Sequence, residues 1–225
     1  MLSDYALRVF LDNNQVDEEI NICGGEIFLN PEWKEHLHTC ACYASEMRIV
    51  TNGSLFYTKK GNKTKTLREF LEVLENIASR GVRVSVCISN DTFHQEQYYK
   101  KGLLPLGTVI KYFRWDLNDL DSDYLYYEED TRARYGNKIF PLGRAITKGV
   151  YTCKPNCTID DDEIKNGNIQ ELTLMPDYKV YACCNGFGYI GEGDDSNETL
   201  MENLTKLHWP EKRSCLHCGL KHYKN

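Results

Sequence analysis

Long hydrophobic runs are missing from this sequence of 225 residues. No apolar stretch approaches the roughly 20 residues that a membrane-spanning helix needs, which excludes a helical membrane protein. The first residues, MLSDYALRVFLDNN, have neither the basic segment nor the small-residue cleavage site of a secretory signal. The sequence therefore predicts a cytoplasmic protein.

An excess of positive charge is also missing. The chain has 27 Lys and Arg against 33 Asp and Glu, and its formal net charge of −6 argues against extensive binding to phosphate groups. The last segment, with PEKR and KHYKN, is locally basic, a pattern typical of a solvated surface. With 41% hydrophobic and 27% charged residues, and no internal repeat, the composition is that of a soluble globular protein.

Cysteine, by contrast, is abundant. The chain has ten cysteines and no export signal, and reducing compartments keep thiols free of disulfides. Metal or cluster ligation therefore explains the cysteines better than disulfide bonds do. Six of the ten follow residue 148, where the composition changes, which predicts a larger domain with a small appendage.

Strand-like and helix-like patterns alternate through the first 115 residues. The clearest helix is expected at 66–81, with Thr66 as its N-cap and Gly81 as its stop. Further helices are expected at 2–14, 31–45 and 93–101, and strands at 19–23, 47–51, 82–89 and 108–115. This alternation is typical of a parallel α/β sheet, whose ligands bind beyond the carboxyl ends of the strands. The acidic, tyrosine-rich stretch 116–135 has no clear period and is interpreted as an insertion.

Six short motifs follow one another along the chain. They are GGEIFLNPEW (24–33), IVTNGSL (49–55), VSVCISNDTFHQEQY (84–98), PLGRA (141–145), CKPNC (153–157) and LTLMPDYKVYACC (172–184). In this order they resemble radical S-adenosylmethionine (AdoMet) enzymes that carry a cysteine-rich C-terminal extension of the SPASM or twitch type. The resemblance covers nearly the whole chain. It implies an α/β fold with an incomplete (β/α) partial barrel over residues 1–147 and a cysteine-rich, metal-binding region over 148–225.

The same resemblance implies a site for AdoMet. It places the turn formed by Gly24, Gly25 and Glu26 against the methionine amino group, and the residue chemistry agrees, because glycines allow close backbone approach and a glutamate complements an ammonium. It also places the ends of the next strands at ligand or substrate, with Thr51, Asn52, Gly53, Ser89, Asn90, Asp91 and His94. Taken singly, each of these motifs is also explained by a local turn or a helix cap.

One departure from the family is large. The triplet Cys-x3-Cys-x2-Cys, which holds the AdoMet-cleaving iron-sulfur cluster in the family, does not occur here, and Asp160 stands where Cys153 and Cys157 would need a third thiolate. We therefore interpret 2–14 as the first barrel helix and expect the preceding strand and cluster loop to be lost or to lie elsewhere. Without the iron that would chelate its amino and carboxylate groups, AdoMet is expected to bind weakly, if it binds. The isolated cysteines are expected to be buried, inert thiols: Cys23, Cys40, Cys42 and Cys87.

The C-terminal cysteines occur in pairs that favour a metal centre. The pairs are Cys153 with Cys157, Cys183 with Cys184, and Cys215 with Cys218. Zinc and iron-sulfur clusters are both held by four thiolates, so the ligands leave both open, while the resemblance favours iron-sulfur. Adjacent cysteines rarely bind one metal together, so one of the middle pair is expected to be spare. Residues 148–225 show too little apolar periodicity to form a core of their own, and a metal would supply the missing stability.

Two functions are consistent with these observations. The first is a radical AdoMet enzyme that modifies a peptide or another substrate, with AdoMet near Glu26, an auxiliary cluster in the tail, and the missing cluster loop supplied elsewhere. The second is a catalytically degenerate module that binds a peptide or partner protein. A zinc-stabilised nucleic-acid binder is a weaker third, because the chain is acidic. The exposed edge beside the 19–23 strand also predicts association with another chain.

Overall fold

The structure is a computed structural model that describes residues 2–14, 19–23, 26–120, 123–130, 172–183 and 187–206. The chain divides into two compact units. One unit comprises residues 16–137, and the other comprises residues 1–15 together with 138–225. No helix in the described part of the chain is long and apolar enough to cross a membrane.

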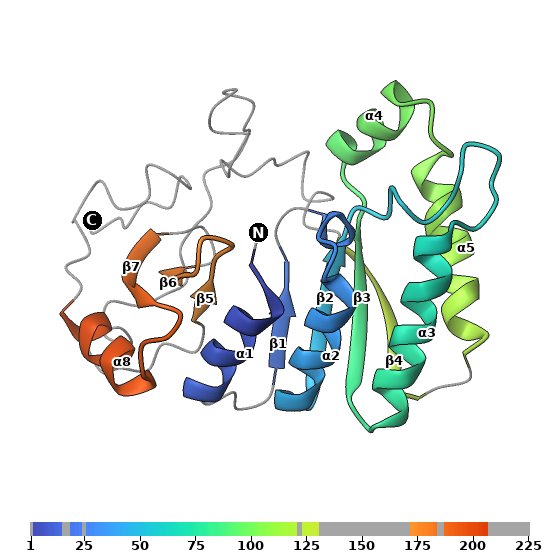
Figure 1. Cartoon of the computed structure of the whole chain (residues 1–225). Coiled ribbons are helices and arrows are strands. Elements are labelled where there is room, and N and C mark those ends of the chain that lie inside the picture. Colours follow the sequence, from blue (N-terminus) through green and yellow to red (C-terminus); the bar gives the residue numbers. More distant parts are fainter. Residues whose placement is uncertain are drawn as a thin grey trace, which may run out of the picture. The chain divides into compact units, whose positions relative to one another are not determined.

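The unit of residues 16–137 contains a four-stranded parallel sheet. Its strands are β1 (Glu19–Ile22), β2 (Glu46–Thr51), β3 (Arg83–Ser89) and β4 (Leu125–Asp130), in the spatial order β1-β2-β3-β4 (Figure 1). The predicted parallel α/β class is therefore confirmed. Among the described strands only β2 pairs with β1, so β1 has a second edge that no described strand covers. Closure toward a barrel, and association through this edge, stay predictions.

Helices connect the strands, and the three longest of them cover one face of the sheet (Figure 1). The helices are η1 (Ile27–Leu29), α2 (Trp33–Tyr43), α3 (Lys65–Ser79), α4 (Thr92–Lys100) and α5 (Leu106–Asn118). Figure 1 shows α2, α3 and α5 along the same face of the sheet. Between them lies an aromatic core in which Phe56 stacks on Phe113 with ring centroids 5.0 Å apart and on Phe70 at 5.7 Å. All three side chains are fully buried, so they fix the helices to the sheet.

The expected strand at 108–115 is wrong, because this segment lies within α5. The apolar residues of α5 recur at helical spacing, which places them on one buried side of the helix. They are Leu106, Val109, Ile110, Phe113 and Leu117. The fourth strand instead lies inside the acidic stretch that was interpreted as an insertion, as β4. The charged residues of β4 made the segment resemble a solvated loop. In the structure Glu128 and Glu129 are both ion-paired, so these charges are compatible with a strand.

The helix expected at 66–81 forms, but its N-cap is Thr64 and not Thr66. Helix α3 begins at Lys65, and the Thr64 hydroxyl accepts a hydrogen bond from the backbone N–H of Leu67 at 3.2 Å. The expected stop is confirmed. Gly81 has a φ of +83°, a left-handed conformation that favours glycine, and its N–H donates to the carbonyl of Ala78.

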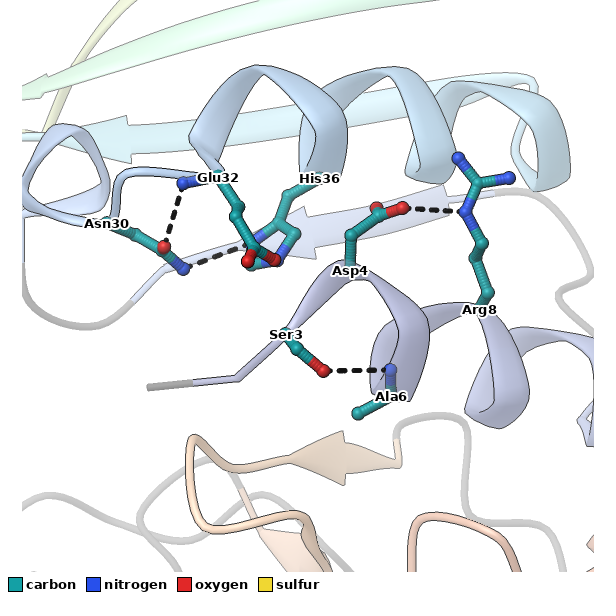
Figure 2. A network of polar contacts seen from close by, with 7 residues as sticks. All are labelled: Ser3, Asp4, Ala6, Arg8, Asn30, Glu32 and His36. Atoms are coloured by element: carbon teal, nitrogen blue, oxygen red, sulfur yellow. Dashed lines mark hydrogen bonds and ion pairs between the residues drawn. The ribbon is translucent and has the colours of Figure 1, made fainter.

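The other unit contains α1 (Asp4–Asn13) and a small antiparallel sheet. The sheet comprises β5 (Thr173–Leu174), β6 (Lys179–Cys183) and β7 (Phe187–Glu192), and α8 (Asn197–Thr205) follows it. Figure 2 shows how α1 begins: the Ser3 hydroxyl accepts from the N–H of Ala6, and Arg8 pairs with Asp4 at 2.6 Å. Contacts such as the bond from the Asn13 amide to the carbonyl of Asp194, 2.9 Å long, belong to this unit.

The described part of this unit contains a small buried apolar cluster, while the expectation for residues 148–225 stays a prediction. Five apolar side chains are at most 2% exposed: Val180, Ala182, Ile190, Leu200 and Leu204. They come from a strand pair and a helix, so no single period marked them in the sequence. The segment MPDYKVY contains the turn of a hairpin between β5 and β6, with a left-handed Tyr178 at the end of this turn.

Candidate ligand-binding site

The carboxyl ends of β1 and β2 meet at the Glu26 carboxylate. Because parallel strands all end at one edge of the sheet, the residue that follows β1 reaches the residues that end β2. The Thr51 hydroxyl donates to Glu26 Oε1 at 2.8 Å, and the backbone N–H of Asn52 donates to Oε2 at 3.1 Å. Both carboxylate oxygens are therefore held in place.

The turn after β2 brings Tyr98 of α4 into the same cluster. Gly53 has a φ of +67°, and a Cβ at this position would lie 3.4 Å from the Tyr98 hydroxyl, so glycine suits both the conformation and the close approach. The buried Tyr98 donates this hydroxyl to the carbonyl oxygen of Asn52 at 2.8 Å. Helix α4 is thereby joined to the end of β2.

The electrostatics of the cluster centre on Glu26. Burial raises the pKa of its carboxyl, although the hydrogen bonds from Thr51 and Asn52 and the charge of His94 act in the opposite direction. Burial together with the Glu26 charge raises the pKa of Tyr98, so this hydroxyl stays protonated. The site thus contains a partly desolvated carboxylate whose charged form a nearby cation would stabilise.

The end of β3 supplies the next part of the site. Ser89 ends the strand and is buried, and Asp91 caps α4 by accepting the N–H of His94 at 2.8 Å. The other oxygen of Asp91 lies 2.7 Å from Nδ1 of His94. Burial alone would raise the pKa of Asp91, but these bonds to His94 outweigh it and the pKa is lowered. The helix-cap interpretation of this motif is therefore confirmed.

The end of β4 adds residues that the sequence analysis missed. Glu129 pairs with Arg114 of α5 and accepts a hydrogen bond from the Asn90 amide at 3.4 Å, while Gln95 donates to the other end of Asn90 at 3.0 Å. The Arg114 guanidinium also lies 4.6 Å from the centre of the Tyr127 ring. Because β4 was not predicted, no sequence signal pointed to Glu129. Tyr98 was missed as well, although it lies four residues after His94 on the same helix.

The loop that follows Glu26 is fixed by polar contacts at the start of α2. The Asn30 side-chain oxygen accepts the N–H of Glu32 at 3.0 Å, which leaves the amide nitrogen to donate to Nδ1 of His36 at 3.3 Å (Figure 2). Phe28 within this loop packs edge-on against Phe70 with ring centroids 4.8 Å apart. One hydrophobic contact and one polar network thus hold the segment that positions Glu26.

The structure brings together only part of the predicted site. Glu26, Thr51 and Asn52 are in direct contact, and Asp91 with His94 lies close enough for the charge of His94 to act on Glu26. Gly24 and Gly25 lie outside the described residues. An ammonium fits this arrangement, because a carboxylate with a raised pKa lies at the ends of the strands and the described site contains no Lys or Arg bound to it.

The predicted tail ligands cannot be placed in a site. Cys183 ends β6, and the other five lie outside the described residues: Cys153, Cys157, Cys184, Cys215 and Cys218. Among the residues that the structure describes, no three His, Cys, Asp or Glu side chains are arranged to hold a metal ion. The expectation that the isolated cysteines are all buried is wrong in part. Cys40 and Cys87 are buried, whereas Cys23 and Cys42 are exposed.

Comparison with solved structures finds a likeness to the crystal structure of Streptococcus suis SuiB, with 10% sequence identity and a TM-score of 0.34. The alignment covers 96% of this chain and 63% of that chain, so this chain spans less than two thirds of that protein's length. No protein-family model matches the sequence, and no curated protein matches it. At this TM-score the likeness carries no argument, and a functional proposal depends on the site and the sequence motifs.

Proposed function

We propose that this chain is a radical SAM-like protein that binds AdoMet at the carboxyl ends of β1, β2 and β3. The observation that carries the proposal is the Glu26 carboxylate, which Thr51 and Asn52 hold while burial raises its pKa. A buried carboxylate of this kind gains most from a ligand ammonium, such as the methionine amino group of AdoMet. The motif order that resembles radical AdoMet enzymes supports the same ligand.

The chain's own residues would bind and orient AdoMet. Glu26 would accept the ammonium, the glycines before it would allow close backbone approach, and Asn52 and Tyr98 would keep the carboxylate in place. In the resembling enzymes an iron-sulfur cluster supplies the electron that cleaves AdoMet, and the cysteine triplet that would hold it does not occur in these 225 residues. The proposed enzyme therefore modifies a peptide or protein substrate only with a cluster loop supplied elsewhere.

That missing triplet favours a second candidate function. In it, the chain is a catalytically degenerate module that binds a peptide or partner protein, with the tail cysteines holding a structural iron-sulfur or zinc site. The two candidates differ in one readout. Reductive AdoMet cleavage that appears when a polypeptide with a Cys-x3-Cys-x2-Cys loop is added supports the enzyme, and binding without cleavage under the same conditions supports the module.

Calorimetry with two ligands tests the AdoMet site. Methylthioadenosine lacks the amino-acid part of AdoMet, so Glu26→Gln should weaken AdoMet about tenfold or more and leave methylthioadenosine unchanged, because only AdoMet loses a charge-assisted hydrogen bond. Glu75→Gln on the exposed face of α3 makes the same chemical change away from the site and should change neither ligand. Equal losses for both ligands would show that Glu26 acts only through the fold. No binding of AdoMet to the unchanged protein would overturn the proposal.

A further inference from the structure

Two segments of this acidic protein carry basic residues without acidic ones and lie in the unit of residues 16–137. Residues 55–65 and 97–115 contain eight of the 27 Lys and Arg and none of the 33 Asp and Glu. The rest of the chain therefore has 19 basic against 33 acidic residues. Basic residues gathered in this way create a local positive potential on a molecule whose formal net charge is −6.

Contacts within the unit of residues 16–137 bring the two segments together. The β2–α3 connection lies against α5, where the Tyr57 and Tyr112 rings are 5.3 Å apart (Figure 1). The same connection reaches the turn after α4, because the Lys59 ammonium lies 3.7 Å from the Cβ position of Gly102. The charges of both segments thus face one region of the surface.

Four of these lysines have no carboxylate partner among the residues that the structure describes. Lys63 pairs with the buried Asp116, and Lys100 pairs with Glu96 at 3.4 Å. The exposed lysines without such a pair are Lys59, Lys60, Lys101 and Lys111. Their charge is available to a partner.

Large aromatic side chains are exposed on α5 beside Lys111. Tyr112 is 40% exposed and Trp115 is 66% exposed, and their spacing with Lys111 places all three on one side of α5. Tryptophan and tyrosine are among the residue types that most often anchor protein interfaces. This side of α5 therefore offers an apolar anchor next to Lys111, which pairs with no carboxylate of the described residues.

We propose that Lys59, Lys60, Lys101, Lys111, Tyr112 and Trp115 form a docking surface for a short acidic peptide segment that also carries apolar side chains. The positive charge of the lysines favours a partner with negative charge. A short peptide confines its carboxylates to this surface, whereas a long polyanion such as nucleic acid extends onto the acidic remainder of the molecule and is repelled. The proposal does not depend on AdoMet binding.

Fluorescence anisotropy with a labelled peptide of glutamate, leucine and phenylalanine tests the surface. The double variant Lys59→Gln/Lys60→Gln should weaken binding roughly two- to thirtyfold, the loss expected for two exposed ion pairs. Lys179→Gln/Lys206→Gln removes the same charge from the other unit and should leave the affinity unchanged. Trp115→Ala should weaken binding about tenfold or more if this side chain is an anchor.

Three results would overturn the proposal. The first is no binding of the peptide to the unchanged protein at low salt, and the second is an equal loss in both lysine variants. The third is tighter binding of a single-stranded oligonucleotide of the same charge, with the same dependence on Lys59 and Lys60, which would assign the surface to nucleic acid. None of the substituted side chains is buried, so circular dichroism should show unchanged folding in every variant.

Discussion

At the residue scale, Glu26 combines two opposing influences. Burial raises the pKa of its carboxyl, and hydrogen bonds from Thr51 and Asn52 stabilise the charged form without fully offsetting burial. Because the folded-state pKa lies above the ordinary value of 4.5, the stability that this group contributes is complete below that pH. It is lost as the pH rises through the folded-state pKa.

Glu26 should therefore change how stability depends on pH. Compared with Glu26→Gln, the free energy of unfolding of the unchanged protein should fall as the pH rises from about 4.5 toward neutrality, since the glutamine does not titrate. Urea denaturation of both proteins at several pH values measures this difference. Parallel curves would show that the carboxyl titrates alike in the folded and unfolded chains.

Tyr98 provides a second prediction at the residue scale. Its buried hydroxyl donates to the carbonyl of Asn52, so Tyr98→Phe should lower the free energy of unfolding by about 1–3 kcal/mol through an unsatisfied buried carbonyl. The neighbouring Tyr99 is 87% exposed, and Tyr99→Phe makes the same change with no expected effect. Chemical denaturation of the two variants checks the difference, and equal stabilities would contradict the contact.

At the scale of elements, the segments with one strong period were predicted correctly and those with mixed signals were not. Helix α3 buries one regular face, and strand β3 is an apolar run whose last four residues are all buried, and the sequence shows both patterns. Segment 108–115 is rich in β-branched and aromatic residues, which favoured a strand, but packing of Phe113 against Phe56 selected the helix. Among the described strands β4 pairs with β3 alone. It bears ion-paired glutamates, so its pattern depends on neighbours that are distant in the sequence.

The N-cap of α3 can be tested with a matched pair of threonines. Thr64→Ala should lower the free energy of unfolding by about 1 kcal/mol, because it removes the hydroxyl that accepts the N–H of Leu67. Thr66→Ala lies within the helix, where alanine is the better helix former, and should cost nothing. Denaturant melts of both variants compare them directly. A larger loss at Thr66 would restore the cap that the sequence alone suggested.

At the scale of the whole molecule, the two units differ in how they are stabilised. The parallel sheet has a large aromatic and aliphatic core, whereas the described part of the other unit has a small one around Ile190 and Leu200. Small cores commonly need an additional source of stability, such as a metal. The paired tail cysteines are the proposed source, with zinc or an iron-sulfur cluster as the centre.

Metal release should therefore affect one unit more than the other. Because thiolates are the proposed ligands, a chelator or a lower pH should release the metal and unfold the C-terminal unit. The unit that contains the parallel sheet should keep its fold, so the helical circular dichroism signal of its helices should remain. Metal analysis of anaerobically purified protein identifies the centre as iron with sulfide or as zinc. The prediction would be contradicted if the protein contained neither iron nor zinc and all six tail thiols could be titrated.

The sequence by itself determined the parallel α/β class, the clearest helices and the residues at the ends of β1, β2 and β3. These features depend on local periodicity and on the rule that parallel strands end at one edge, and both can be read from a single chain. Only the tertiary structure decided that Thr51 and Asn52 hold Glu26, that Tyr98 belongs to the same cluster, and that Lys59 lies beside the end of α4. Such contacts join segments that are far apart in the sequence, and packing selects them among many alternatives.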